Sequence, residues 1–63
     1  MTIMEQIYNG LIEQIDFYSW VKNDDGSLSD AQKEHLVSLR NTIQCFGERA
    51  EKWVELANSL LCN

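Results

Sequence analysis

The chain has 63 residues, 44% of them hydrophobic, and its ten acidic and five basic residues give a formal net charge of −5. This length allows one domain with a small core, and such domains commonly need a disulfide, a metal or a partner subunit for stability. The acidic balance opposes binding to phosphate groups, and the hydrophobic content excludes a disordered acidic tail.

The first expected element is an amphipathic helix over about residues 2–22. Thr2 and Glu5 have the spacing of a capping box, which marks a helix start. Apolar residues then recur in steps of three and four, at Met4, Tyr8, Leu11, Ile15 and Tyr18. With further apolar residues on both sides, this face covers near half the circumference, so the helix should contact more than one neighbour. Gly10 lies within the run and is a possible point of close approach between helices.

A turn is predicted at about residues 23–28, where Asn, Asp, Gly and Ser residues cluster. We expect the first helix to end near Val21 or Lys22. Ser29 and Gln32 form a second capping box and should begin the next helix. The chain therefore reverses direction in this segment.

The turn also resembles the calcium loop of EF-hand proteins. In the twelve residues that begin at Val21, Asn23 and Asp25 match the third and fifth positions of that loop, and Gly26 matches the sixth. Val21 replaces the first aspartate, however, and Gln32 replaces the bidentate glutamate, so the strongest ligands of a hard cation are missing. We interpret the segment as an Asx-rich turn and predict no metal or cofactor, with a degenerate metal-responsive module as the alternative.

The second expected element is one long helix over about residues 29–61, in which no proline occurs. Its apolar residues alternate steps of three and four, at Leu36, Leu39, Ile43, Phe46, Ala50, Trp53, Ala57 and Leu60. Gly47 is the one residue in this run that could break the helix. Because the spacing continues across Gly47, we predict a continuous helix.

The two helices differ in length, and this difference predicts the assembly. The first spans about 30 Å and the second about 48 Å, so a hairpin leaves the second helix uncovered beyond about Arg49. Each large apolar side chain left in water forgoes roughly 1.5–3 kcal/mol. We therefore predict an all-α, two-helix hairpin domain over residues 1–63 that forms a homodimeric helical bundle. The alternative is a three-helix monomer with a turn at Gly47.

Two sets of residues are predicted to form contact surfaces. The predicted dimer interface comprises Phe46, Ala50, Trp53, Val54, Ala57, Leu60 and Leu61. Phe17, Trp20 and Val21 lie outside the main apolar stripe of the first helix and form a possible partner-binding patch. These three could equally cover the far end of the other protomer.

No catalytic site is predicted. His35 is the only histidine, and we expect a partly buried position beside the apolar stripe, with a pH-dependent switch as the alternative. Cys45 points to the polar side of the helix and has no nearby base, so nucleophilic catalysis is not indicated. On a continuous helix Cys45 and Cys62 lie about 25 Å apart, which rules out a disulfide between them.

The charged residues and the composition suggest a cytoplasmic protein. Arg40, Arg49 and Lys52 project to different sides of the helix, so nucleic-acid binding is not expected. Acidic residues on both helices could instead imitate phosphates, which makes an acidic nucleic-acid mimic another alternative. No secretion signal and no apolar run near 18 residues is present, so no membrane contact is expected.

The whole chain resembles the small helical-hairpin proteins encoded in the early accessory region between exo and xis of lambdoid phages. The resemblance rests on the length, the acidic balance, the Asn-Asp-Asp-Gly turn and the long helix with Trp53. It implies a dimeric protein of the host bacterial cytoplasm that biases development between lysis and lysogeny. It transfers no functional residues. We therefore expect a non-enzymatic regulatory protein that acts by protein–protein interaction with a host or phage protein.

Overall fold

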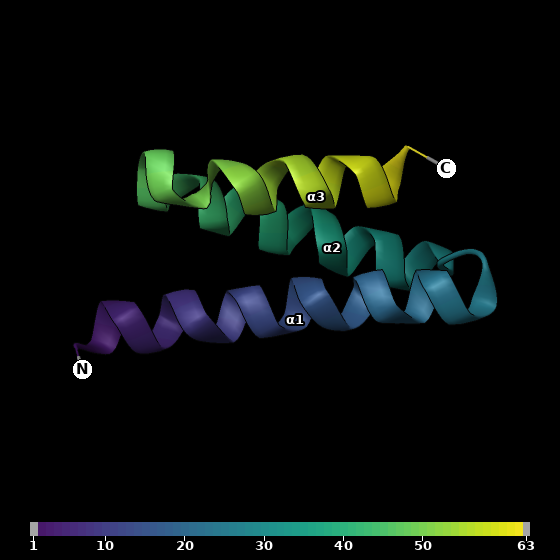
Figure 1. Ribbon diagram of the computed structural model, residues 1–63, viewed down its shortest axis with the longest axis horizontal. Coiled ribbons are helices and arrows are strands. Elements are labelled where there is room, and N and C mark those ends of the chain that lie inside the picture. The colour runs from purple at the N-terminus through teal and green to yellow at the C-terminus, as the bar shows by residue number, and fades with distance from the viewer. Residues whose placement is uncertain (1, 63) are drawn as a thin grey trace.

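The computed structural model describes residues 2–62, and every regular element in this range is helical. The elements are α1 (Ile3–Asp25), α2 (Asp30–Ile43), the 3-10 segment η1 (Gln44–Ala50) and α3 (Glu51–Leu61). Figure 1 shows α2 running back along α1, and α3 then folding back along α2. The all-α hairpin of the first two helices is therefore confirmed. Residues 1 and 63 of the predicted domain lie outside the described range.

Helix α1 begins as predicted but ends later than predicted. The Thr2 hydroxyl accepts a hydrogen bond from the Glu5 backbone N–H (3.1 Å), which satisfies one of the free amides at the helix start. The helix continues to Asp25, because the residue that ends it is Gly26 in the left-handed conformation (φ 85°). The Gly26 N–H donates to the Lys22 carbonyl (2.7 Å). Glycine is the usual residue directly after the end of a helix, because it adopts the left-handed conformation without strain. The prediction that α1 ends near Lys22 is therefore wrong by about three residues.

Helix α2 begins with the predicted capping box. The Ser29 hydroxyl accepts from the Gln32 N–H (3.2 Å), and the Gln32 side chain accepts from the Ser29 N–H (2.8 Å). Leu28, which precedes this cap, is buried in the core. The turn between α1 and α2 is therefore short and fixed at both ends.

The predicted continuous helix over residues 29–61 is wrong. Gly47 adopts φ 79° and ψ −147°, which is outside the helical region and is accessible to glycine almost alone. At this residue the chain leaves the direction of α2, and Figure 1 shows α3 returning beside α2. The arrangement is the three-helix alternative with a turn at Gly47.

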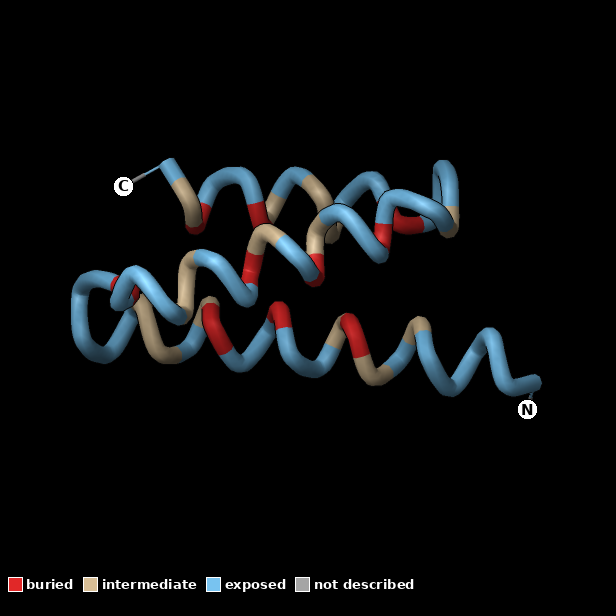
Figure 2. The backbone as a smooth tube through the Cα atoms, turned by 180° about the vertical axis from the view of Figure 1, so that it is seen from behind, coloured by how far each residue is buried: buried red, intermediate tan, exposed pale blue. Residues whose placement is uncertain are grey.

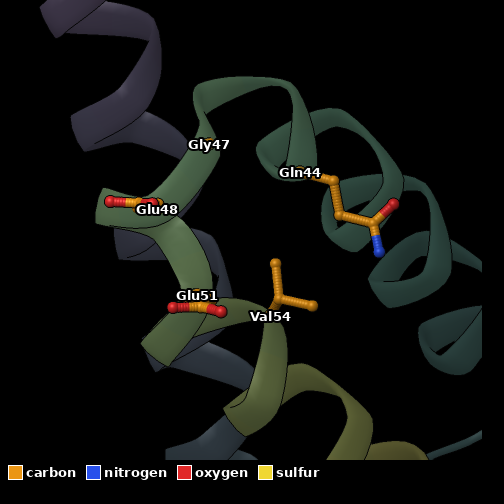
Figure 3. A pocket seen from close by; sticks show the side chains of 5 residues that line it. All are labelled: Gln44, Gly47, Glu48, Glu51 and Val54. Atoms are coloured by element: carbon orange, nitrogen blue, oxygen red, sulfur yellow. The ribbon is translucent and has the colours of Figure 1, made fainter.

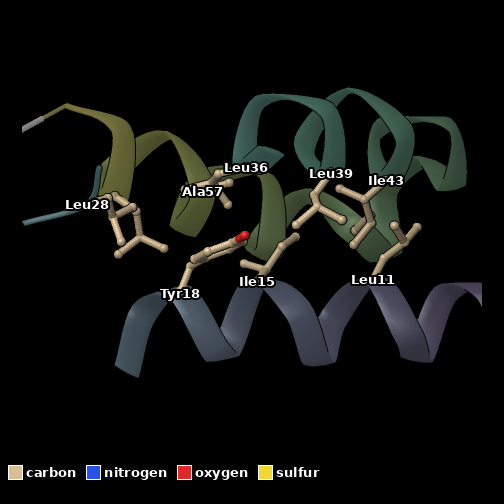
Figure 4. Packing of buried hydrophobic residues seen from close by; sticks show 10 residues of the cluster. Leu11, Ile15, Tyr18, Leu28, Leu36, Leu39, Ile43 and Ala57 are labelled. Atoms are coloured by element: carbon tan, nitrogen blue, oxygen red, sulfur yellow. The ribbon is translucent and has the colours of Figure 1, made fainter. Parts of the chain in front are cut away.

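The core lies between the three helices. In Figure 2 the buried positions of each helix face the other two helices. Ile15, Leu36 and Ile43 are fully buried, and Figure 4 shows the α1 side chains pointing toward those of α2. The complete set of buried hydrophobic residues is Leu11, Ile15, Tyr18, Leu28, Leu36, Leu39, Ile43, Ala50, Ala57 and Leu60.

All seven residues of the predicted dimer interface either belong to this core or pack against it. Ala50 and Ala57 are fully buried, and Leu60 is 7% exposed. The other four residues of that interface are half-buried and pack against the same core, namely Phe46, Trp53, Val54 and Leu61. The uncovered overhang that predicted a dimer does not exist, because α3 covers its own apolar face against α1 and α2.

Two polar contacts fasten α3 to the other helices. The Lys22 ammonium donates to the Leu60 carbonyl (2.9 Å), at the end of α3 where backbone carbonyls lack helical partners. The Arg40 Nη1 donates to the Asn58 side-chain oxygen (2.8 Å). Both contacts join residues far apart in the sequence, so they fix the direction in which α3 returns.

Candidate interaction surface

The exposed large hydrophobic side chains of residues 2–62 all belong to α1. They are Ile3, Met4, Ile7, Phe17 and Trp20. Ile3 is 75% exposed, Phe17 56% and Trp20 65%, whereas the large apolar residues of α2 and α3 are buried or half-buried. The surface that still lacks an apolar neighbour is therefore on the first helix.

Phe17 and Trp20 lie about one helical turn apart on α1, and both are exposed. The Phe17 ring meets the Tyr18 ring edge-on, with 5.7 Å between the ring centroids. This contact leaves more than half of the Phe17 side chain in water. Val21, the third residue of the predicted patch, is half-buried and packs against the core. Phe17 and Trp20 are thus the exposed part of the predicted patch.

The exposed face of α1 is longer than the patch of Phe17, Trp20 and Val21 that the sequence predicted. A second row of side chains follows α1 in alternating steps of four and three, at Ile3, Ile7, Gly10, Gln14, Phe17 and Val21. We call these six residues the α1 row. The missed signal was present in the sequence, because the same spacing rule that marks the core stripe also marks this row. It was overlooked since Gly10 and Gln14 interrupt its apolar character.

Tyr18 and His35 connect the exposed face of α1 to α2. A hydrogen bond of 2.6 Å joins the Tyr18 hydroxyl and His35 Nδ1, and the two rings meet at 90°. Tyr18 is buried, whereas His35 is exposed and not partly buried as expected. The pair fixes which side of α2 borders the α1 row.

A pocket of about 280 Å³ is lined by residues on both sides of the turn at Gly47. Figure 3 shows its lining residues Gln44, Gly47, Glu48, Glu51 and Val54. Its side chains are two carboxylates, one amide and one valine, without a histidine, cysteine or serine among them. Nothing in this lining indicates a specific ligand, so we do not assign a site here.

The metal-responsive alternative is not supported by the geometry of the turn. Asn23 and Asp25 both lie in α1, and two residues along a helix turn the side chain by about 200°. These two side chains therefore cannot converge on one ion as they do in a calcium loop. Within residues 2–62, no group of three or more His, Cys, Asp or Glu side chains is placed to hold a metal ion.

Three of the five basic residues, Lys22, Arg40 and Arg49, make contacts within the chain. The Arg49 guanidinium lies 4.6 Å from the centroid of the Tyr8 ring, and the Tyr8 hydroxyl donates to the Arg49 carbonyl (2.9 Å). Lys22 and Arg40 hold α3, as described above. Cys45 and Cys62 are free and exposed, as predicted for Cys45. These contacts leave the exposed face of α1 as the candidate interaction surface.

No helix in the described part of the chain is long and apolar enough to cross a membrane. No protein-family model matches the chain, and no curated protein or solved structure shows significant similarity to it.

Proposed function

We propose that this protein is a non-enzymatic interaction module that binds another protein through the exposed face of α1. The observation that carries the proposal is that Phe17 and Trp20 remain 56% and 65% exposed, whereas in the described part of the chain α2 and α3 leave no large apolar side chain exposed. Large aromatic side chains are enriched among the residues that dominate binding energy at protein interfaces. The fold buries less than half of either side chain.

The exposed rings are also costly for an isolated protein. Each large apolar side chain left in water forgoes roughly 1.5–3 kcal/mol of burial energy. A serine at either position would keep the helix at a cost of only a few tenths of a kcal/mol in helix propensity. Contact with a partner gives a physical reason for aromatic residues at these positions.

The test is a quantitative pull-down from bacterial lysate with the immobilised chain and the variant Phe17→Ser/Trp20→Ser. The control variant Cys45→Ser/Glu55→Ser changes two exposed residues on other elements. We expect the wild type and the control to capture the same protein and the α1 variant to lose it. Circular dichroism should show an unchanged fold in all three. Equal capture by the α1 variant would contradict the proposal.

The developmental role implied by the phage resemblance is a proposal that rests on that resemblance alone. If it holds, expression of the wild-type chain in a lysogen changes the frequency of prophage induction. The Phe17→Ser/Trp20→Ser variant should lose this effect, and Cys45→Ser/Glu55→Ser should keep it. If both variants still change the induction frequency, the developmental role does not depend on the exposed face of α1.

A further inference from the structure

The α1 row has the spacing of a helix-packing surface. Its six residues alternate steps of four and three over the length of α1, which is the pattern that keeps one stripe of a helix facing a neighbouring helix. The row is turned by about 120° from Ile15, the fully buried centre of the core stripe. Four of its residues, Ile3, Ile7, Gln14 and Phe17, are exposed, whereas Gly10 and Val21 are half-buried.

Helix α2 provides the second wall for an incoming helix. Because Tyr18 and His35 are in contact, the side of α2 that carries His35 borders the α1 row. That side continues along α2 in steps of four and three through Ala31, His35, Ser38 and Thr42, all of them exposed. Three of these four side chains are small, and the Thr42 hydroxyl is turned back to donate to the Ser38 carbonyl (2.9 Å). A helix lying on the α1 row would therefore meet little steric resistance from α2.

Gly10 lies in the middle of the α1 row and leaves open space outside the helix. A Cβ atom added at Gly10 would meet no atom within 4 Å, so the fold does not require glycine there. Glycine inside a helix costs about 1 kcal/mol relative to alanine. Close approach of another helix backbone is a physical reason for such a residue, since small side chains let two helices pack at short distance.

The charges around the α1 row indicate which kind of helix could bind there. Helix α1 carries the acidic residues Glu5, Glu13, Asp16, Asp24 and Asp25 against the single basic residue Lys22. The Lys22 ammonium is held by the Leu60 carbonyl at the end of α3. Glu13 and Asp24 lie along the outer edge of the α1 row by helical spacing. A cationic partner gains from this arrangement in both association rate and specificity.

We propose that the α1 row binds a cationic amphipathic α-helix of a partner protein, which packs as a fourth helix against α1 and α2. Its apolar side chains contact Ile7 and Phe17, its backbone approaches Gly10, and its basic residues face Glu13 and Asp24. This inference rests on the proposed function and names its partner class. A second copy of this chain is a poor occupant, because it would bring one acidic α1 against another.

The test uses two synthetic helical peptides of roughly 20 residues, about the 30 Å span of the α1 row. Both carry leucine at heptad positions a and d, and the other positions are mainly lysine in one peptide and glutamate in the other. Fluorescence anisotropy of labelled peptide should show binding of the lysine peptide at least about tenfold tighter than the glutamate peptide. A third peptide with lysine but alanine at positions a and d reports purely electrostatic attraction and should bind about tenfold more weakly than the leucine version.

Variants of the chain locate the binding surface. Gly10→Leu fills the open space at the centre of the α1 row and should weaken lysine-peptide binding by about tenfold while the melting temperature stays or rises. Glu13→Lys/Asp24→Lys should weaken it by a similar factor. The matched control Asp16→Lys/Glu55→Lys makes the same change in net charge at exposed positions outside the α1 row and should have a much smaller effect.

Three results would overturn the inference: equal affinity for the lysine and glutamate peptides, full binding by Gly10→Leu, or a chain that sediments as a dimer which Phe17→Glu dissociates. The last result would assign the α1 row to a second copy. The pull-down with Phe17→Ser/Trp20→Ser is independent of these peptides. A further result is that a partner is captured through Phe17 and Trp20 while the lysine and glutamate peptides bind equally well. That result would support the proposed function and contradict the inference that the partner is a cationic helix.

Discussion

The contact between Tyr18 and His35 joins the buried core to the exposed surface. The Tyr18 ring is buried, and its hydroxyl reaches an exposed histidine on α2 at 2.6 Å. A buried hydroxyl without a hydrogen-bond partner costs about 1–3 kcal/mol. His35 therefore allows a tyrosine at a core position while its own ring edge remains in water.

A double-mutant cycle of Tyr18→Phe and His35→Ala measures this contact. Tyr18→Phe keeps the ring and should lower the free energy of unfolding by about 0.5–1.5 kcal/mol. His35→Ala leaves the hydroxyl unpaired and should cost about 1–3 kcal/mol. The double variant should be less destabilised than the sum of the two single variants. Additive effects in urea unfolding would show that the hydrogen bond contributes nothing in solution.

The sequence predicted the exposure of single residues better than the contacts between residues. Phe17 and Trp20 were recognised because they fall outside the core stripe of their own helix, which local spacing reveals. The pairing of Tyr18 with His35 was not predicted, since the two residues are 17 positions apart and no spacing rule links them. Such a contact depends on how two helices are aligned, which only the fold defines.

At the scale of elements, Gly47 decides the course of the second half of the chain. The apolar spacing from Leu36 to Leu60 continues across Gly47 because α2 and α3 both face one core, one on each side of the turn. The spacing of apolar residues in the sequence therefore cannot distinguish one long helix from two helices that fold back on each other. The backbone of Gly47, with φ 79° and ψ −147°, makes the difference. The same reasoning explains why the length mismatch predicted an uncovered overhang.

Gly47→Ala should destabilise the protein because alanine is strained in this backbone conformation. The expected loss is about 1–3 kcal/mol in the free energy of unfolding. Gly10→Ala is the matched control, since Gly10 has helical neighbours and open space, and it should raise stability by about 1 kcal/mol. Urea unfolding followed by circular dichroism at 222 nm measures both.

A chemically synthesised chain with D-alanine at position 47 separates backbone strain from other effects. D-residues favour positive φ, so this variant should regain most of the stability that Gly47→Ala loses. Equal destabilisation by L-alanine and D-alanine would mean that the added methyl group, and not the turn geometry, is the cause. In that case the turn at Gly47 would not be the element that stops the long helix.

At the scale of the whole molecule, one chain covers the residues that the sequence assigned to a dimer interface. Ala50, Ala57 and Leu60 are buried by α1 and α2, and Lys22 and Arg40 hold α3 in place. The structure does not test the homodimer that the sequence predicted, but the uncovered overhang on which that prediction rested is absent from the fold. What remains exposed lies on α1, where acidic residues accompany the aromatic rings.

We therefore expect the isolated protein to sediment as a single copy of 7.3 kDa in physiological salt. A pair would carry a formal charge of −10, twice the −5 of one chain, and would bring its acidic helices together. High salt screens this repulsion, so any weak self-association should grow as the salt concentration rises. Sedimentation equilibrium at several protein concentrations, with Phe17→Ser/Trp20→Ser as the control, measures both effects. A dimer that forms equally well in low salt, and that this variant still forms, would contradict the expectation. It would show that the chain dimerises through a surface other than the exposed face of α1.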